Sequence, residues 1–165
     1  MNFFRIECNL GQNRKRRLSM ELHNMLQGTA TMLVAMLAGS MLFFSFVMAP
    51  LIFIKLDIEV AGKFVRVVFP WYYLLIIILA TIGSLVLIAI APLNACLLAL
   101  VAASTLYCRQ SLMPRINEYR DRSKAGETGT NKTFDKLHRR SEIINGLQLL
   151  AVVAVLLHLA FVNFS

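Results

Sequence analysis

A polar stripe on one face of the last apolar segment is the strongest candidate for chemistry in this sequence. His138, Ser141, Asn145 and Gln148 follow steps of three, four and three residues, and Phe134 precedes them at the same spacing. An α-helix places such steps on one face. Imidazole, hydroxyl and amide groups can bind a polar head group or a small cofactor. Because unpaired amides are costly in lipid, we predict that Asn145 and Gln148 point into a helical bundle.

Three interpretations of this stripe stay open at this point. The first is structural, with the stripe capping or cross-linking the cytoplasmic ends of the helices. The second is a binding site for a head group or a small cofactor. The third, catalysis, is disfavoured because no nucleophile–base pair or carboxylate pair accompanies the stripe.

Haem ligation would need two histidines at similar depth on facing helices. His138 and His158 are 20 residues apart on one predicted helix, which separates them by about 30 Å. His23 and His158, which could both lie near the outer face, are the only plausible pair, although His23 precedes the first predicted span. We therefore predict no cofactor and no metal, and keep haem as an alternative.

The elements that must position the stripe are three blocks without Asp, Glu, Lys or Arg. Residues 29–54, 67–108 and 143–165 contain 26, 42 and 23 residues. One helical crossing of a bilayer takes roughly 20 apolar residues, so the middle block is long enough for two helices, with Pro92 near its centre. The blocks predict an all-α integral membrane four-helix bundle. Its helices are expected over residues 29–54, 70–90, 93–113 and 134–163, after a basic leader over 1–28.

The composition agrees with a protein whose main partner is the lipid bilayer. The hydrophobic fraction is 58%, above the roughly 45–50% of soluble domains. The net charge of +8 comes from basic residues that flank apolar helices, where they anchor a protein at lipid head groups. We therefore predict no nucleic-acid partner, and a homo-oligomer or a larger membrane complex as further partners.

The distribution of basic residues predicts the orientation. Twelve Lys and Arg residues lie in the segments 55–66 and 109–140, against five before residue 18. The positive-inside rule then places these two segments, including a loop over 115–133, in the cytoplasm, and both termini outside a bacterial inner membrane. The cluster at 14–17 opposes this orientation. One hypothesis that removes the conflict is translation from Met20.

Small residues spaced by four predict where the helices pack closely. The third predicted helix has the longest series, and a self-association face on it is the alternative to ordinary packing within the bundle. The residues in this prediction are Ala35, Gly39, Ala80, Ser84, Ala95, Ala99, Ala103 and Gly146.

Prolines and aromatic residues mark the expected helix ends. Pro50 should kink or end the first helix, and Pro114 should end the third. Trp71, Tyr72 and Tyr73 are typical of an interfacial aromatic belt.

The run Phe134–Asn145, with Phe, His, Ser and Asn at this spacing, resembles the end motif of the transmembrane protein 205-like family. Three further segments agree: Ala-Pro-Leu-Ile-Phe at 49–53, Ala-Gly-Lys at 61–63 followed by Phe-Pro-Trp-Tyr at 69–72, and Pro-Arg-Ile at 114–116. The resemblance covers about residue 28 to the C-terminus. It implies a small four-helix membrane protein without an assigned activity, and it adds Phe69, Pro70 and Arg115 to the candidate site.

A weaker similarity is to small four-helix haem-associated membrane proteins, such as the oxygen-independent-looking protoporphyrinogen oxidases found in bacteria. Those proteins carry a histidine in their first helix, whereas residues 29–54 contain none. Transport is disfavoured because the three blocks hold no Asp, Glu, Lys or Arg. We predict a non-enzymatic scaffold, assembly factor or accessory subunit that binds lipid or an apolar cofactor. The alternatives are a haem- or porphyrin-linked redox protein and an oligomeric small-molecule exporter.

Overall fold

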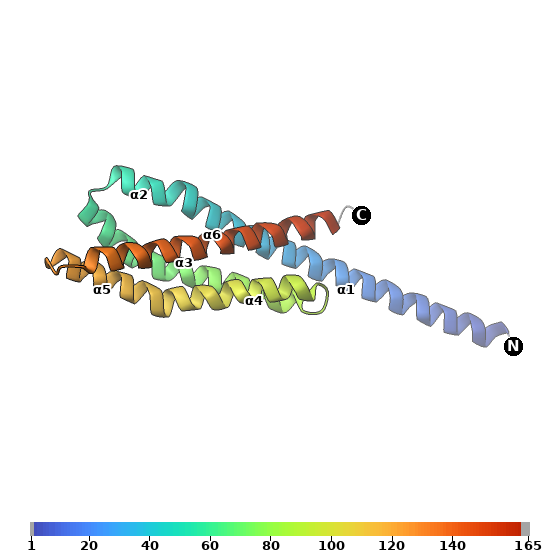
Figure 1. The fold of residues 1–165 in the computed structure, drawn as a ribbon. Helices are drawn as coiled ribbons and strands as arrows, with labels where there is room; N and C mark the ends of the chain where they lie inside the picture. Colours follow the sequence, from blue (N-terminus) through green and yellow to red (C-terminus); the bar gives the residue numbers. More distant parts are fainter. Residues whose placement is uncertain (1, 163–165) are drawn as a thin grey trace.

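The chain folds into long helices that lie side by side in a computed structural model (Figure 1). The structure describes the backbone of residues 2–162 and the side chains of residues 12–161. Two short π-helical turns, η1 and η2, interrupt the α-helices. The elements are α1 (Asn2–Phe43), η1 (Phe44–Met48), α2 (Ala49–Lys55), α3 (Ile58–Leu87), α4 (Pro92–Tyr107), η2 (Cys108–Leu112), α5 (Met113–Lys124) and α6 (Thr130–Val162).

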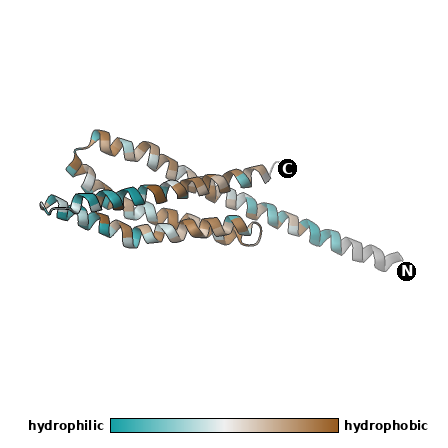
Figure 2. Ribbon diagram, viewed as in Figure 1, coloured by the Kyte–Doolittle hydropathy of each residue, from teal (hydrophilic) through white to brown (hydrophobic). Residues whose placement is uncertain are grey.

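Four helices in the described part of the chain are long and apolar enough to cross a membrane. They cover Gln12–Lys55, Ile58–Leu87, Pro92–Lys124 and Thr130–Phe161. Figure 2 shows that the middle of the bundle is mainly hydrophobic, while hydrophilic residues gather on α5, the start of α6 and the projecting part of α1. The prediction of an all-α four-helix bundle is therefore confirmed.

The four helices form a ring in which each contacts two neighbours: α1 lies against α3 and α6, and α4 also lies against α3 and α6. Leu37, Ile76, Leu98 and Val152, one from each of these helices, are fully buried in the shared core. Both termini and the α3–α4 turn lie at one end of the bundle, which we call the terminal end (Figure 1). The α2–α3 and α5–α6 connections lie at the other end, which we call the charged-loop end.

Helix α1 is continuous with the basic leader. It has 42 residues, so it is about 63 Å long and exceeds the roughly 30 Å bilayer core. Its side chains at residues 12–25 are exposed, and its first part projects beyond the bundle (Figure 1). Residues 2–28 therefore continue into the first crossing helix without a break in the helix.

Two predicted helix starts are wrong because charge does not end a helix. Helix α3 begins at Ile58, not at 70, and contains Pro70 in its interior. Helix α6 begins at Thr130, not at 134. Much of the loop predicted over 115–133 is therefore helical, and its turn is short, with Gly126 and Gly129 at φ values of 85° and 84°. The predicted end of the fourth helix at 163 lies outside the described residues.

Pro114 does not end the third helix, which continues to Lys124. Pro50 likewise does not end the first helix. At both prolines, a π turn ends two residues earlier in the chain. A π turn is wider than an α turn and makes room for the pyrrolidine ring. The first crossing helix ends at Lys55, where Leu56 turns to extended backbone.

Of the small residues that were predicted to pack between helices, some are buried and others are exposed. Ala80, Ser84 and Ala95 are buried, and the Ser84 hydroxyl donates to the carbonyl oxygen of Ala95 at 2.8 Å across α3 and α4. Five other residues do not pack between helices of the bundle, because they are exposed on its outer surface, and for these the prediction is wrong: Ala35, Gly39, Ala99, Ala103 and Gly146. Steps of four drift by about 40° each around a helix, so a series soon leaves the buried face. Self-association through Ala99 stays a prediction.

Candidate functional site

A cleft of about 410 Å³ lies near the charged-loop end of the bundle. Four parts of the chain form its walls: η1 with α2, α3, η2 with α5, and α6. The lining side chains are Phe44, Ser45, Phe46, Ala49, Phe53, Val65, Phe69, Tyr72, Tyr73, Cys108, Leu112, Met113, Ile116, Asn117, His138, Ser141, Glu142, Asn145, Gly146 and Leu149.

Aromatic rings form one side of the cleft. Phe44 from η1 stacks on Tyr72 with ring centroids 4.1 Å apart, and meets Phe69 edge to face at 5.0 Å. Phe69 in turn meets Tyr73 edge to face at 5.6 Å. Such contacts fix the orientation of the rings and present a rigid apolar surface.

Polar groups of α6 form the other side. The Asn145 amide nitrogen donates to the Tyr73 hydroxyl at 3.4 Å, while the Asn145 Oδ1 atom is buried and has no hydrogen-bond partner among the described residues. Ser141 is buried beside it, and His138 pairs with Glu142 at 3.2 Å nearer the loops. A buried acceptor without a donor is costly, so this position favours a ligand or water that donates a hydrogen bond.

Gln148 is the member of the stripe that does not line the cleft. It is 4% exposed and lies between α6 and α4, where its amide nitrogen donates to the Ser104 hydroxyl at 2.7 Å. Its Oε1 atom is also buried without a partner among the described residues. Gln148 therefore links two helices next to the cleft.

Of the other predicted site residues, one lines the cleft and three do not. Phe69 lines the cleft, whereas Phe134 stacks behind His138 with ring centroids 5.7 Å apart. Pro70 is absent from the lining, although it lies next to Phe69 in α3. The prediction is wrong for Arg115, because its side chain is exposed outside the cleft and Ile116 and Asn117 line it instead.

The cleft opens on the side of α2. Helix α2 diverges from α3 and α6 at the charged-loop end (Figure 1). Phe46 and Phe53 line the opening and are 70% and 63% exposed. Gly146 faces the same space on α6, since a Cβ atom there would meet nothing within 4 Å. These three residues belong to the uncharged blocks, so this opening lies along the apolar parts of the helices.

Sequence reasoning missed the aromatic side of the cleft. Tyr72 and Tyr73 were expected at the membrane interface with Trp71, but only Trp71 is exposed on the outer surface, at 70%. The signal was present, because Phe69, Tyr72 and Tyr73 are spaced by three and four and so share a helix face. Phe44 and Cys108 also line the cleft, and each lies in a π turn, η1 or η2. The sequence pattern did not predict these π turns.

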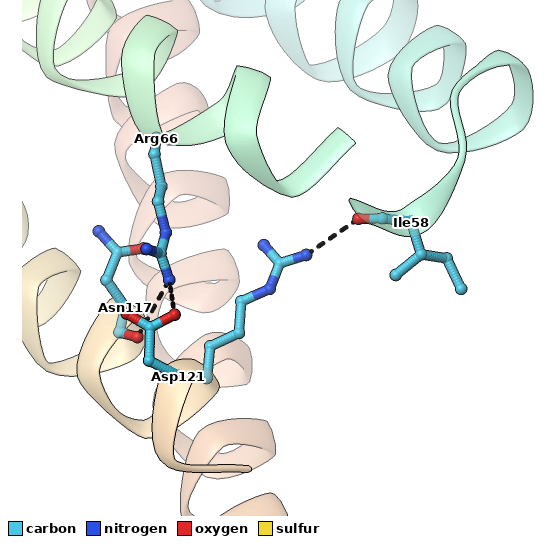
Figure 3. Close-up of polar contacts among 5 residues, drawn as sticks. Ile58, Arg66, Asn117 and Asp121 are labelled. Carbon is cyan, nitrogen blue, oxygen red and sulfur yellow. Dashed lines mark hydrogen bonds and ion pairs between the residues drawn. The ribbon is translucent and has the colours of Figure 1, made fainter. Parts of the chain in front are cut away.

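A cluster of polar contacts holds α3 against α5 beside the cleft, and we call it the clasp (Figure 3). Arg66 contacts the Asp121 carboxylate at 2.5 Å and donates to the carbonyl oxygen of Asn117 at 3.2 Å. Arg120 donates to the carbonyl oxygen of Ile58 at 3.2 Å. Its guanidinium lies against Gly62, where a Cβ atom would overlap it. The absence of a side chain at Gly62 thus permits the second half of the clasp.

Replacing Arg66 with alanine should loosen α3 from α5 locally without unfolding the bundle. The pair is partly exposed, and exposed ion pairs contribute little to global stability. We expect amide hydrogen exchange to speed up by about three- to tenfold at residues 113–124, with a small change in the thermal midpoint.

The matched control for the clasp is Lys63→Ala, which removes a fully solvated pair with Glu59 on the same helix. It should leave exchange at residues 113–124 unchanged. Equal exchange rates in the two variants would show that the clasp does not hold α5.

The polar groups that line the cleft include an amide, a hydroxyl, an imidazole and a carboxylate. No group of three or more His, Cys, Asp or Glu residues that could hold a metal ion occurs within the part of the chain that was described. An aromatic wall opposite an amide, a hydroxyl and an imidazole can bind a molecule with an apolar body and a polar head.

Fold and cleft together define the class: a small all-α protein with four helices suited to a membrane and a ligand-sized cleft at one end. Residues 32–125 match the model of DUF4149, a domain of unknown function, and the chain belongs to this family. The match includes three of the four segments that resemble the transmembrane protein 205-like family, but not the run at 134–145. The family has no assigned function. Comparisons with curated proteins and with solved structures gave no match.

Proposed function

We propose that this protein binds an amphipathic, lipid-like molecule in the cleft and acts as a non-enzymatic scaffold, assembly factor or accessory subunit in a membrane. The observation that carries this proposal is the buried Asn145 Oδ1 atom, which lacks a donor at the polar side of an aromatic cleft. A ligand head with a hydroxyl, amide or amine group would supply that donor. Its apolar body would lie against Phe44, Phe69 and Tyr72.

The chemistry of His138 supports a binding role over catalysis. His138 pairs with the exposed Glu142 and stacks on Phe134. Within residues 12–161, no Ser, Thr or Cys side chain forms a hydrogen bond with it. A general base needs such a partner or a substrate proton within reach.

The arrangement of the ends supports the proposed orientation, with both termini outside a bacterial inner membrane. The termini share one end of the bundle with the α3–α4 turn, and the clusters of basic residues on α5 and early α6 lie at the other (Figure 1). We also infer kinship with the transmembrane protein 205-like family, on the segments at 49–53, 61–72 and 114–116.

The test is native mass spectrometry of the purified full chain, comparing the wild type with Asn145→Leu. We expect the wild type to retain an amphipathic molecule, and Asn145→Leu to retain about tenfold less, because one buried hydrogen bond to the head group is lost. The thermal midpoint should change little, since Asn145 forms only a long hydrogen bond within the chain.

The control is Asn24→Leu, which makes the same change at an exposed position of α1 outside the cleft. It should retain the ligand as the wild type does. A wild type that carries no amphipathic molecule from its native membrane, or equal retention in both variants, would refute the proposal.

A further inference from the structure

A second pocket lies at the opposite, terminal end of the bundle. It has a volume of about 340 Å³ and is formed where α1 enters the bundle, at the α3–α4 turn and at the last turns of α6. Its polar lining consists of His23, Gln27, Asn94 and His158. The structure thus brings together His23 and His158, which lie 135 positions apart in the sequence.

Asn94 fixes the ring of His158. Asn94 is 4% exposed, and its amide nitrogen lies 2.8 Å from Nδ1 of His158. With the Asn94 amide as donor, Nδ1 accepts, and the neutral ring carries its proton on Nε2. The other nitrogen of the ring is then a donor.

Gln27 lines the pocket and has no side-chain partner among the described residues. The residue is 8% exposed, and its side chain forms no hydrogen bond with any residue that the structure describes. A primary amide can donate two hydrogen bonds. A pocket occupant with an acceptor atom would therefore provide Gln27 with a partner.

The N-terminus of α4 faces the same pocket. Pro92, Leu93 and Asn94, the first residues of this 16-residue helix, all belong to the lining. Pro92 has no N–H group, so the amide groups of Leu93 and Asn94 are the donors of this first turn, and they have no acceptor within the helix. The helix dipole favours a negative charge at the same place.

Charge in the surroundings points in the same direction. Within residues 12–161, no Asp or Glu side chain lines the pocket. The basic cluster at 14–17 lies six to nine residues before His23 on α1, or about 9–14 Å along the helix axis. Glu21 lies two residues before His23 but outside the lining, and against the four basic residues at 14–17 it leaves a net charge of +3 (four positive, one negative) on this segment. A negatively charged occupant would therefore meet donors and a net positive charge.

We propose that this pocket binds an oxyanion, a phosphate or carboxylate group, at the terminal end of the bundle. His158 Nε2, the Gln27 amide and the backbone N–H groups of Leu93 and Asn94 are the donors. The oxyanion belongs either to a lipid head group or to a free solute. This site shares no lining residue with the cleft near the charged loops. The proposal of an oxyanion site therefore does not depend on the function proposed for that cleft.

The experiment titrates the full chain, in a neutral detergent, with inorganic phosphate and with dihexanoyl phosphatidic acid, against chloride at equal ionic strength. Ring ¹⁵N signals of His158 report on the pocket, and calorimetry gives the affinities. A response to both phosphate probes supports a site for free oxyanions. A response to the lipid alone supports a head-group site.

Two variants of Gln27 and one matched control sharpen the test. Gln27→Leu should weaken binding by about tenfold, because a hydrogen bond to a charged group is lost. Gln27→Glu keeps the size of the side chain and should abolish binding through charge repulsion. Gln12→Leu changes an exposed glutamine of the same helix and should have no effect. No response of His158 to either probe, or equal affinity in all variants, would overturn the proposal.

Discussion

Replacing Gly83 with leucine is expected to lower the free energy of unfolding by about 1–3 kcal/mol, since added volume in a packed core forces its neighbours to move. Gly83 is buried in α3, and a Cβ atom there would already lie 3.0 Å from Cδ1 of Leu98 in α4. Leu98 is itself fully buried in the core that the four helices share. A leucine at position 83 should therefore push α3 and α4 apart. Thermal unfolding in detergent would show the loss as a lower midpoint.

Gly39→Leu is the matched control for this effect. Gly39 lies in the first crossing helix, is exposed, and has nothing within 4 Å of its Cβ position. The same substitution should leave the midpoint unchanged or raise it slightly, because leucine favours helix more than glycine does. If Gly39→Leu destabilised the protein as much as Gly83→Leu, the described packing of α3 on α4 would be wrong.

Replacing Gly146 with tryptophan should reduce retention of the cleft ligand by about tenfold or more, at unchanged stability, because the indole would take the ligand's place. Gly146 lines the cleft and faces open space on α6. The indole ring can fill that space and contact the aromatic side chains opposite. Native mass spectrometry of the variant, with its thermal midpoint, would separate loss of ligand from loss of fold.

The control for this substitution is Gly39→Trp, since Gly39 is equally open but lies outside the cleft. It should bind as the wild type does. Full retention in Gly146→Trp would mean that the ligand does not occupy this part of the cleft. Loss in both variants would point to a general effect of tryptophan on the bundle.

The two predictions test different properties, stability and ligand binding, by substituting glycines in helices. Gly83 and Gly146 are both helical glycines in apolar segments, and of the two only Gly146 was predicted from the sequence to pack between helices. One lies where two helices approach closely, and the other lies at the opening of a cleft. Stability should respond to the first and ligand binding to the second.

The sequence by itself determined the class of protein and the number of long apolar helices. The reason is physical: a helical crossing needs a fixed length of apolar residues, and three uncharged blocks of 26, 42 and 23 residues allow four such helices. The polar stripe on α6 was also readable, because three- and four-residue steps on one helix define a face without reference to its neighbours. Amides are costly in lipid, which indicated that this face turns inward.

Only the tertiary structure decided which faces of the other helices are buried. A residue that faces lipid is as apolar as one that faces the core, so hydrophobicity does not distinguish inside from outside in a membrane helix. Gly39 and Ala99 therefore looked like packing residues, and Tyr73 looked like an interfacial one, until the neighbours of each helix were known. Phe44, Tyr72 and Asn145 meet in one cleft, and His23 and His158 meet in another, because the ring of helices brings these segments together. The spacing of residues along one helix does not indicate which residues of other helices they will contact.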